Sequence, residues 1–350
     1  MGKHKKIRVG ITSGDINGIG LEVTIKALQD ARVYEHCTPI IYASEDVMKT
    51  HMETLKLEGF HFKSIKDLEH VDANKVNVLN AWEDEVEVAL GENTKIGGTY
   101  AFQSLKTAVE DLASTKIDVL VTSPIDKKNI QSEEFDFPGH TEFLADYANE
   151  ENPLMILCHE GLRVALVTGH IALEDVSKKL TSDLIERKLD TMNKSLIQDF
   201  GVHRPRIAVL GLNPHNGDGG LMGEEEAQVI IPAINNAQEA GILAFGPYAA
   251  DGFFGSPSRS KFDGVLAMYH DQGLAPFKAL AFDEGINFTA GLPIVRTSPD
   301  HGVAFDIAGK NAASERSMRQ AISVACDIFK QRKHYREISS DPLPEHSKKK

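Results

Sequence analysis

The sequence is poor in cysteine, with three in 350 residues, and Cys37, Cys158 and Cys326 show no paired spacing. This scarcity argues against a disulfide framework and a zinc knuckle, and it is typical of a reducing compartment. Long apolar runs that could span a bilayer are missing, and the basic start of the chain leads into a short strand-like stretch instead of a secretory core. We therefore expect a cytoplasmic protein.

Positive charge is also in short supply, since 38 Lys and Arg face 51 Asp and Glu, for a net charge of -13. Such a balance argues against a broad nucleic-acid footprint, so any anion must be bound by a few well-placed cationic groups. The common nucleotide fingerprints are absent too. The loop TSGDINGIG (12–20) has its glycines at 14, 18 and 20, which is not Gly-x-Gly-x-x-Gly, and it lacks the Lys-Ser/Thr of a P-loop. The loop is either a tight strand-to-helix turn or a ligand contact.

What the sequence does contain is an ordinary globular composition, in which short β-branched runs alternate with amphipathic segments and no internal repeat occurs. This alternation predicts an α/β sheet with many parallel connections, and a hairpin around Glu160-Gly161 would make the sheet mixed. A disordered, polar tail is expected over 338–350. The predicted strands are 7–12, 39–43, 75–79, 118–122, 154–158, 163–168, 206–210, 264–269 and 291–296, and the predicted helices are 20–31, 100–113, 141–148, 182–200 and 311–330.

Three of the predicted apolar strands lead into a histidine: His170, His215 and His270. In open α/β sheets, ligands bind beyond the carboxyl ends of the strands, so three such imidazoles can meet at one place. Imidazole suits zinc and other first-row divalent metals, and three protein ligands leave positions open for a substrate. The alternative is that each is an ordinary surface or hydrogen-bonded histidine, since none has local metal-motif spacing.

Other segments contain groups suited to binding an anion. His140 and Thr141 begin a predicted helix, where N–H groups and the helix dipole favour a phosphate, although Thr141 also suits a plain N-cap. Lys278 lies between apolar residues, which favours either a partly buried lysine of lowered pKa or a surface lysine with a covered stem. Arg296 ends a predicted strand, and HGVAFDIAGK (301–310) is either an adenosine-binding loop or an ordinary connector.

Together these segments resemble one family, the 4-hydroxythreonine-4-phosphate dehydrogenases of pyridoxal phosphate synthesis. The matching segments span nearly the whole chain in family order: 12–20, PGHTEFLA (138–145), VTGH (167–170), LNPHNG (212–217), MYHDQGLAPFKAL (268–280), GINFTAGLPIVR (285–296) and 300–310. HGVAFDIAGK is also similar to the adenosine-binding loop of isocitrate and isopropylmalate dehydrogenases, which bind NAD without a Rossmann domain. One departure is visible, because the family usually has prolines at the positions of Ile16 and Leu21 and alanine at that of Asn17.

The resemblance implies a fold like that of isocitrate and isopropylmalate dehydrogenases. We expect two α/β lobes with a mixed, largely parallel sheet and the active site in the cleft between them. Residues 1–337 would form one catalytic unit of two interleaved lobes, with the chain crossing between them more than once. The resemblance further implies a homodimer whose active sites are shared across the interface, with no nucleic-acid or membrane partner.

The resemblance also assigns roles to residues. It implies that His170, His215 and His270 bind one divalent metal ion (Zn, Mg or Co), drawn from both subunits. It implies substrate contacts at His140, Thr141, Lys278, Asn287 and Arg296, and a general base among Lys278, Asp251 and Asp271. NAD, or else NADP, would contact the loop at His301, Gly302, Asp306, Gly309 and Asn311.

The implied reaction oxidises 4-phosphooxy-L-threonine at C3 with NAD, and the β-keto acid product loses carbon dioxide to give 3-amino-2-oxopropyl phosphate. Two alternatives stay open. One is a paralogous dehydrogenase of threonate or erythronate 4-phosphate, which would share the metal and phosphate sites. The other is a metal-dependent hydrolase or an acyl- or phosphate-transferring enzyme, which would have no use for the HGVAFDIAGK loop.

Overall fold

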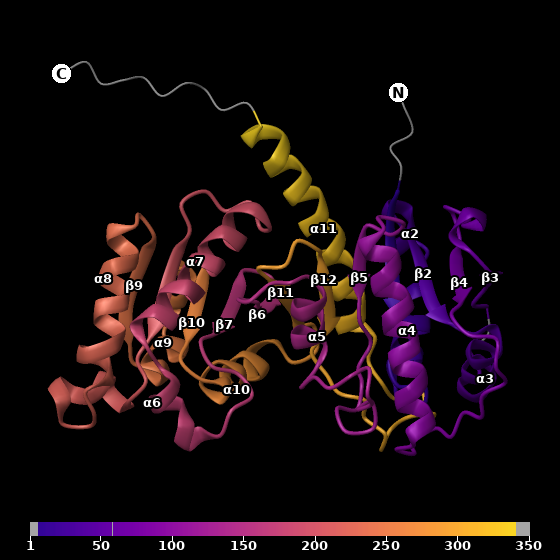
Figure 1. Cartoon of the computed structure of the whole chain (residues 1–350), viewed down its shortest axis with the longest axis horizontal. Helices are drawn as coiled ribbons and strands as arrows, with labels where there is room; N and C mark the ends of the chain where they lie inside the picture. Colours follow the sequence, from indigo (N-terminus) through magenta and orange to yellow (C-terminus); the bar gives the residue numbers. More distant parts are fainter. Residues whose placement is uncertain (1–5, 58, 341–350) are drawn as a thin grey trace.

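The computed structural model describes residues 6–57 and 59–340, and twelve strands of this part form one sheet (Figure 1). The strand order is β3-β4-β2-β1-β5-β12-β11-β6-β7-β10-β8-β9. The strands are β1 (Ile7–Thr12), β2 (Cys37–Ala43), β3 (Phe62–Ile65), β4 (Val76–Asn80), β5 (Val119–Val121), β6 (Leu154–His159), β7 (Leu162–Leu166), β8 (Arg206–Leu210), β9 (Leu243–Tyr248), β10 (Gly264–Ala267), β11 (Ile286–Ala290) and β12 (Arg296–Pro299).

The sheet is mixed and mostly parallel, as the alternating sequence pattern predicts. Only β11 with its two neighbours and β6 with β7 pair antiparallel within this sheet. The hairpin predicted around Glu160-Gly161 is confirmed, because Cys158 pairs with Arg163 and His159 with Leu162. The strand order places β1–β5 at one end and β6–β10 at the other, and β11 and β12 return to the middle. The chain therefore crosses the middle of the sheet once, between β5 and β6, and returns to it with β11 and β12. Its division into two lobes stays a prediction.

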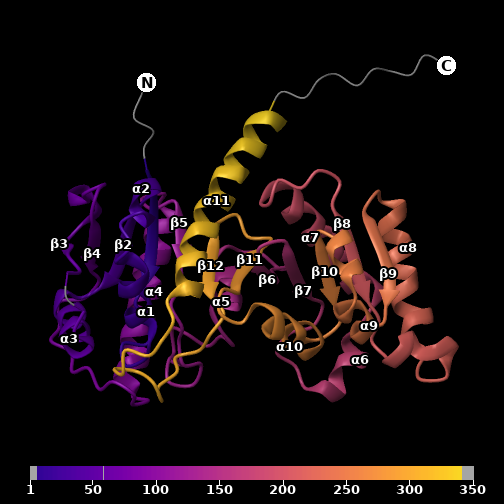
Figure 2. The same ribbon diagram turned by 180° about the vertical axis from the view of Figure 1, so that it is seen from behind.

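Helices cover both faces of the sheet, as Figures 1 and 2 show from opposite sides. They are α1 (Gly20–Leu28), α2 (Val33–His36), α3 (Glu45–Leu55), α4 (Lys95–Ala113), α5 (His140–Tyr147), α6 (Val176–Lys179), α7 (Ser182–Gln198), α8 (Ile231–Glu239), α9 (Ala250–Gly255), α10 (His270–Ala281) and α11 (Arg316–Ser339). Within the described chain, no helix is both long and apolar enough to cross a membrane.

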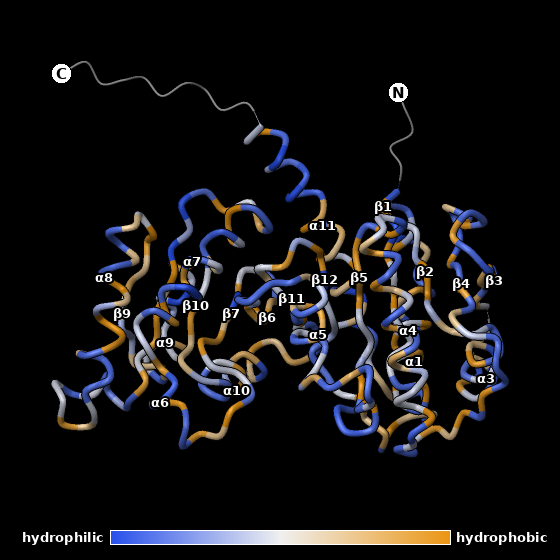
Figure 3. The backbone as a smooth tube through the Cα atoms, in the orientation of Figure 1, coloured by the Kyte–Doolittle hydropathy of each residue, from blue (hydrophilic) through white to orange (hydrophobic). Residues whose placement is uncertain are grey.

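The apolar core is continuous on one face of the sheet and divided on the other. On the continuous face, alternate residues of nearly all strands pack with α1, α3, α7, α8 and α11 in one cluster. On the opposite face, α4 and α5 cover β2, β4 and β5 in a second cluster, and α9 and α10 cover β7, β8 and β10 in a third. The middle of this face, beneath neither cluster, belongs to β11 and β12. In Figure 3 apolar colour follows the strands, and the projecting end of α11 is largely hydrophilic.

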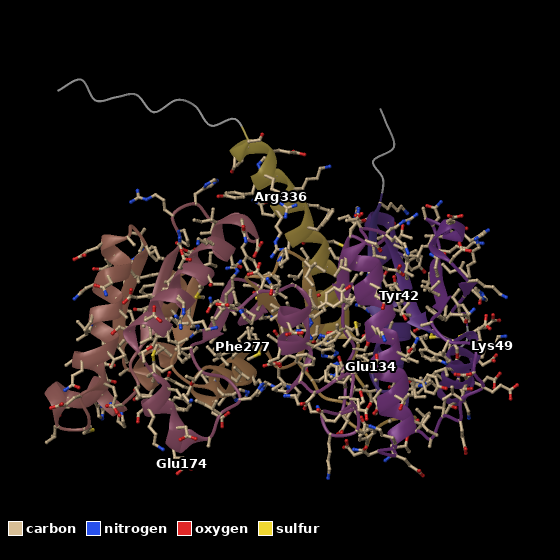
Figure 4. All side chains as sticks on the ribbon, viewed as in Figure 1. Tyr42, Lys49, Glu134, Glu174, Phe277 and Arg336 are labelled. Carbon is tan, nitrogen blue, oxygen red and sulfur yellow. The ribbon has the colours of Figure 1, made fainter. Side chains whose placement is uncertain are left out.

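Two predicted elements differ from the structure near the end of the chain. The strand predicted over 291–296 is wrong, because these residues mostly form the connection between β11 and β12. Gly291 has a φ of +83°, and the carbonyls of Leu292 and Ile294 accept hydrogen bonds from the Arg332 guanidinium instead of a neighbouring strand. Helix α11 continues through Ser339, two residues into the predicted tail, and the rest of that tail beyond Ser340 lies outside the described residues. Figure 4 shows Arg336 on the part of α11 that extends beyond the sheet.

Candidate active site

A cavity of about 280 Å³ opens on the divided face, between α5 and α10. Its floor is the β11–β12 hairpin, in which Asn287 lies opposite Ser298. Strand alternation explains this polar floor. Ile286 and Phe288 point into the continuous core, so Asn287 and Thr289 must face the other way, together with Arg296 and Ser298. The cavity thus lies where the two apolar clusters of this face leave the sheet uncovered.

Arg296 is the most unusual group in the cavity, because it is a cation that is only 2% exposed. Its guanidinium donates to the hydroxyls of Thr122 (3.0 and 2.6 Å) and Thr289 (3.1 Å). No carboxylate in the described part of the chain forms an ion pair with it, and burial lowers its pKa to about 10. A buried charge without a counter-ion is costly, so this arrangement indicates a site for an anionic ligand.

Polar atoms around Arg296 are also left without partners. Nε2 of His140 and Oδ1 of Asn287 are buried and bond to nothing in residues 6–57 and 59–340. His140 is the first residue of α5, and burial, followed by the charges of Arg296 and Lys127, lowers its pKa well below the usual value. Thr141, the next residue, also lines the cavity. Since buried polar groups are nearly always hydrogen-bonded, these atoms are best explained as contacts for a bound molecule.

Two of the three predicted metal ligands meet at the cavity. The rings of His170 and His270 lie 5.6 Å apart between centroids, and both line the cavity. Nδ1 of His270 lies 2.6 Å from a carboxylate oxygen of Asp271. A carboxylate behind an imidazole fixes its orientation and leaves Nε2 for a metal. On the other ring, Nε2 of His170 lies 3.4 Å from Nζ of Lys127, and its Nδ1 lies 3.9 Å from Glu142.

The cavity also contains a lysine–aspartate pair. Nζ of Lys278, on α10, lies 3.4 Å from Oδ1 of Asp300, directly after β12. Burial raises the pKa of Asp300, and the charge of Lys278 opposes that rise. Both residues line the cavity together with the two imidazoles, and the charge of His270 also lowers the pKa of Asp300.

Other predicted site residues lie away from this cavity. His215 is exposed on the loop after β8, Asp251 is exposed on α9, and neither lines the cavity. Accordingly, the described residues contain no cluster of three His, Cys, Asp or Glu side chains able to hold a metal. Asp271 contacts His270 but does not line the cavity itself. A single chain therefore brings together only two of the three predicted ligands.

The predicted cofactor loop reaches the cavity only at its start. His301 and Gly302 line it, and Nε2 of His301 is buried with no partner among the residues described. Beyond them the segment runs over the first loop of the chain, where the Val303 carbonyl accepts the Ile19 N–H (3.0 Å). Asp306 and Asn311 are exposed, and Gly309, between them, packs near Leu90.

Lys127, Glu142 and Asp300 line the cavity and were not singled out by the sequence reasoning. Glu142 lies within PGHTEF, three residues after Gly139. Its position in the first turn of a predicted helix, beside His140 and Thr141, could have indicated a site residue. Lys127 and Asp300 lie in irregular segments after β5 and β12, and only the strand order shows that these two ends are neighbours.

The comparisons with known proteins agree with this geometry. Residues 35–325 match the family model described as "Pyridoxal phosphate biosynthetic protein PdxA". The chain belongs to this family. A 4-hydroxythreonine-4-phosphate dehydrogenase of Bacteroides thetaiotaomicron is 50% identical over 97% of this chain and 94% of its own length. An Oceanobacillus iheyensis relative with the provisional name D-threonate 4-phosphate dehydrogenase is 38% identical over 93% of this chain and 98% of its own length.

A solved structure gives the same picture. The crystal structure of 4-hydroxythreonine-4-phosphate dehydrogenase from Klebsiella pneumoniae matches with a TM-score of 0.79 and 32% identity, over 93% of this chain and 99% of that one. The mixed, mostly parallel α/β fold predicted from the sequence is therefore the fold of the PdxA family, and the chain is a dehydrogenase of that family.

The first loop, which departs from the usual family sequence, is held by buried hydrogen bonds. The Asn17 side chain donates to Thr94 (2.8 Å) and accepts from the Ala89 N–H (2.8 Å). Nearby, the buried carboxylate of Asp15 accepts from Asn129 (2.7 Å), two residues after Lys127. The loop is therefore a structural turn that also anchors the cavity segment carrying Lys127, and no residue of it lines the cavity.

Proposed function

We propose that this chain oxidises 4-phosphooxy-L-threonine at C3 with NAD and releases carbon dioxide to form 3-amino-2-oxopropyl phosphate, in pyridoxal 5'-phosphate biosynthesis in the cytoplasm. The observation that supports it most directly is the buried, unneutralised Arg296 beside two paired imidazoles. This combination suits a small molecule that carries a strong anion at one end and a hydroxyl to be oxidised at the other. The name of the 50% identical relative supports the same substrate.

The anionic groups of the substrate would be held at the floor of the cavity. Arg296 would supply its remaining N–H donors, and His140, Thr141 and Asn287 would add polar contacts at α5 and β11. Lys127 adds a second cation at the rim. These contacts would fix C3 of the substrate opposite the nicotinamide and beside the imidazoles, and orientation of this kind lowers the barrier to reaction.

His170 and His270 fit one divalent metal ion, because two imidazoles face each other and a carboxylate supports one of them. When bound, the ion would act as a Lewis acid that lowers the pKa of the substrate hydroxyl. Zinc, magnesium and cobalt remain the candidates. We propose that His215 supplies the third ligand from a second copy of the chain, since its own loop does not reach the cavity.

A homodimer is consistent with the surface around these imidazoles. Ile171 and Leu173 are 41% and 72% exposed immediately after His170, and Leu221 and Met222 are 78% and 43% exposed after His215. Large apolar side chains next to both parts of an incomplete site favour burial against another subunit. Phe282, at the end of α10, is 76% exposed and extends this surface.

The loop that begins at His301 would hold NAD, or else NADP, with Gly302, Asp306, Gly309 and Asn311 as further contacts. The unpartnered Nε2 of His301 at the cavity supports this assignment. The cofactor would accept the hydride released from C3. As a neutral amine, Nζ of Lys278 would take the hydroxyl proton, and Asp300, 3.4 Å from this nitrogen, would hold the ammonium that forms. Asp251 and Asp271 are less suitable bases, because neither lines the cavity.

A second candidate is a dehydrogenase of threonate or erythronate 4-phosphate, favoured by the provisional name of the Oceanobacillus relative. It would use the same anion and metal contacts, and only the group at C2 of the substrate would differ.

The direct test is NADH formation at saturating NAD, with Zn²⁺, Mg²⁺ or Co²⁺ and each phosphorylated acid in turn. We expect absorbance of NADH to rise fastest with 4-phosphooxy-L-threonine, in step with carbon dioxide release. A higher kcat/KM for threonate or erythronate 4-phosphate would select the second candidate. No NADH from any of the three, and no NADPH when NADP replaces NAD, would exclude both and favour a hydrolase or transferase.

A further inference from the structure

The loop that carries His215 has an unusual backbone. His215, Asn216, Gly217, Asp218 and Gly219 have φ values of 52°, 56°, 75°, 45° and 67°, so five consecutive residues are left-handed. Left-handed geometry is unfavourable for residues other than glycine, least so for Asn and Asp, and three of these five are not glycine. Such a backbone persists only where surrounding contacts determine it, and strain of this kind concentrates at functional sites.

The main contact is made by Glu226, a carboxylate that is only 4% exposed. Its Oε1 accepts the backbone N–H groups of Leu212 and Asn213, each at 2.7 Å. Its Oε2 accepts from the Asn213 side chain at 3.0 Å. No lysine, arginine or histidine in the described ranges forms an ion pair with Glu226. Its negative charge is therefore stabilised by hydrogen bonds from N–H groups of this loop.

The loop is shaped closely around this carboxylate. A Cβ at Gly217 would lie 2.8 Å from Oε2 of Glu226, and one at Gly211 would lie 3.1 Å from Oε1. Glycine at these two positions allows the chain to wrap around the Glu226 side chain. Glu226 begins a π-helical turn (Glu226–Ile230) just before α8. This helix packs on the apolar core and fixes the position of the turn.

Two further side chains tie the loop to neighbouring strands, one to β9 and one to the end of β10. The Asn216 side chain donates to the Pro247 carbonyl (2.9 Å), at the end of β9. Gln272 accepts the Met268 N–H (2.7 Å) and donates to the Gly211 carbonyl (2.6 Å). Gln272 therefore connects the start of the His215 loop to the end of β10, where His270 begins α10.

We propose that Glu226 is a positioning residue that fixes the left-handed loop and so presents His215 to the metal. This rests on the proposed function, in which His215 is a ligand. Glu226 touches neither substrate nor metal. Its action is to satisfy the N–H groups of Leu212 and Asn213, which would otherwise lose their partner and allow the backbone to relax to right-handed or extended geometry.

The test is the affinity of the metal-stripped full-length protein for Co²⁺, measured by calorimetry and by the visible absorption of bound Co²⁺. We expect Glu226→Ala to weaken Co²⁺ binding about 10- to 100-fold, as the loss of a partner behind a metal ligand typically does. Glu226→Gln retains one oxygen for both N–H groups and should recover part of the affinity. Glu224→Ala is the matched control, because Glu224 is exposed and bonds only to Gln228 in the same segment.

A double-mutant cycle separates positioning from general damage to the fold. In a His215→Ala background, Glu226→Ala should weaken Co²⁺ binding no further, since the ligand through which it acts is gone. An equal loss in both backgrounds, or wild-type affinity in Glu226→Ala, would overturn the inference. Unchanged affinity in His215→Ala alone would instead refute the proposed ligand set.

If circular dichroism shows that Glu226→Ala is unfolded, the same cycle is run with Glu226→Asp, which keeps the charge but shortens the side chain by one methylene. The expected result is weaker Co²⁺ binding only where His215 is present. Wild-type affinity in Glu226→Asp would contradict the proposal.

Discussion

At the scale of single residues, Arg296 is the group on which the proposed substrate binding depends most. Burial of this charge is compensated only when an anion binds. In the free protein, three hydrogen bonds to threonine hydroxyls are the contacts that stabilise its full positive charge. Function and stability therefore oppose each other at this position.

We predict that Arg296→Met lowers kcat/KM by roughly 100-fold or more, since charge-assisted hydrogen bonds contribute about 1.5–3 kcal/mol each. The melting temperature of the ligand-free protein should not fall, because the variant removes an unpaired buried charge. Steady-state kinetics and a thermal melt measure both effects, with the exposed Arg316→Gln as control. A normal kcat/KM in Arg296→Met would show that the anion binds elsewhere.

His51 gives a prediction about acid stability. It lies on α3, fully enclosed, with Nε2 2.8 Å from the Ile16 carbonyl, and burial lowers its pKa from 6.5 to about 4. The unfolded chain therefore takes up a proton below pH 6.5 before the folded one does. The free energy of unfolding therefore keeps its full contribution from His51 above pH 6.5. It falls as the pH drops from 6.5 toward 4, by up to roughly 3 kcal/mol from this residue.

Urea denaturation between pH 7 and pH 4.5 tests this, with His51→Gln as the partner variant. Glutamine can still donate to the Ile16 carbonyl but does not titrate. We expect the free energy of unfolding to fall less steeply with acid in His51→Gln than in the wild type. If the free energy of unfolding falls equally with pH in both proteins, groups other than His51 cause the acid dependence.

At the scale of elements, the first loop depends on Asn17, where the family usually has alanine. The side chain of Asn17 is fully buried and ties the loop to Thr94 and to the backbone of Ala89. These contacts connect the turn after β1 to the segment before α4.

We predict that Asn17→Ala destabilises this chain by about 1–3 kcal/mol, because the Ala89 N–H is left without a partner. The KM for substrate should stay unchanged, since no residue of the loop lines the cavity. Chemical denaturation and steady-state kinetics measure the two quantities. A stable variant with an altered KM would place the loop at the substrate instead.

Sequence periodicity located the elements with strong patterns and missed those without. β1 and β8 match their predicted bounds, because apolar runs with clear limits define them. β11 was missed, because Asn287 and Thr289 on its cavity face interrupt the apolar run, and α10 was missed because Gly273 and Pro276 lie within it. The connection at 291–295 resembled a strand, because Leu292 and Val295 are buried. Of this segment, only the Val295 carbonyl bonds to a strand in the described chain, by accepting the Leu120 N–H of β5 at 3.0 Å.

The place of the cavity could be predicted only in part. Strand ends drew attention to His170 and His270, and family resemblance to Arg296; all three line the cavity, and their roles stay predictions. No sequence pattern could show that Asp300 pairs with Lys278 or that Glu226 supports the His215 loop, because both contacts depend on how distant segments fold together.

At the scale of the whole molecule, the fold brings two of the three proposed ligand histidines to one cavity and leaves the third exposed. His170 and His270 follow β7 and β10, which are neighbours in the sheet, and His215 follows β8 on a loop that turns away. Exposed apolar residues beside both parts favour a second subunit that completes the site.

Subunit complementation tests this central claim most directly. His215→Ala and His270→Ala would each be inactive alone, and each would be mixed with the other after unfolding and refolding together. If sites are shared, half of the dimers contain one site with both defects and one intact site, so activity should return to about a quarter of the wild-type value. The account predicts this recovery together with bound metal at the restored sites. The account would be contradicted if the two variants formed heterodimers and the mixture still had no activity.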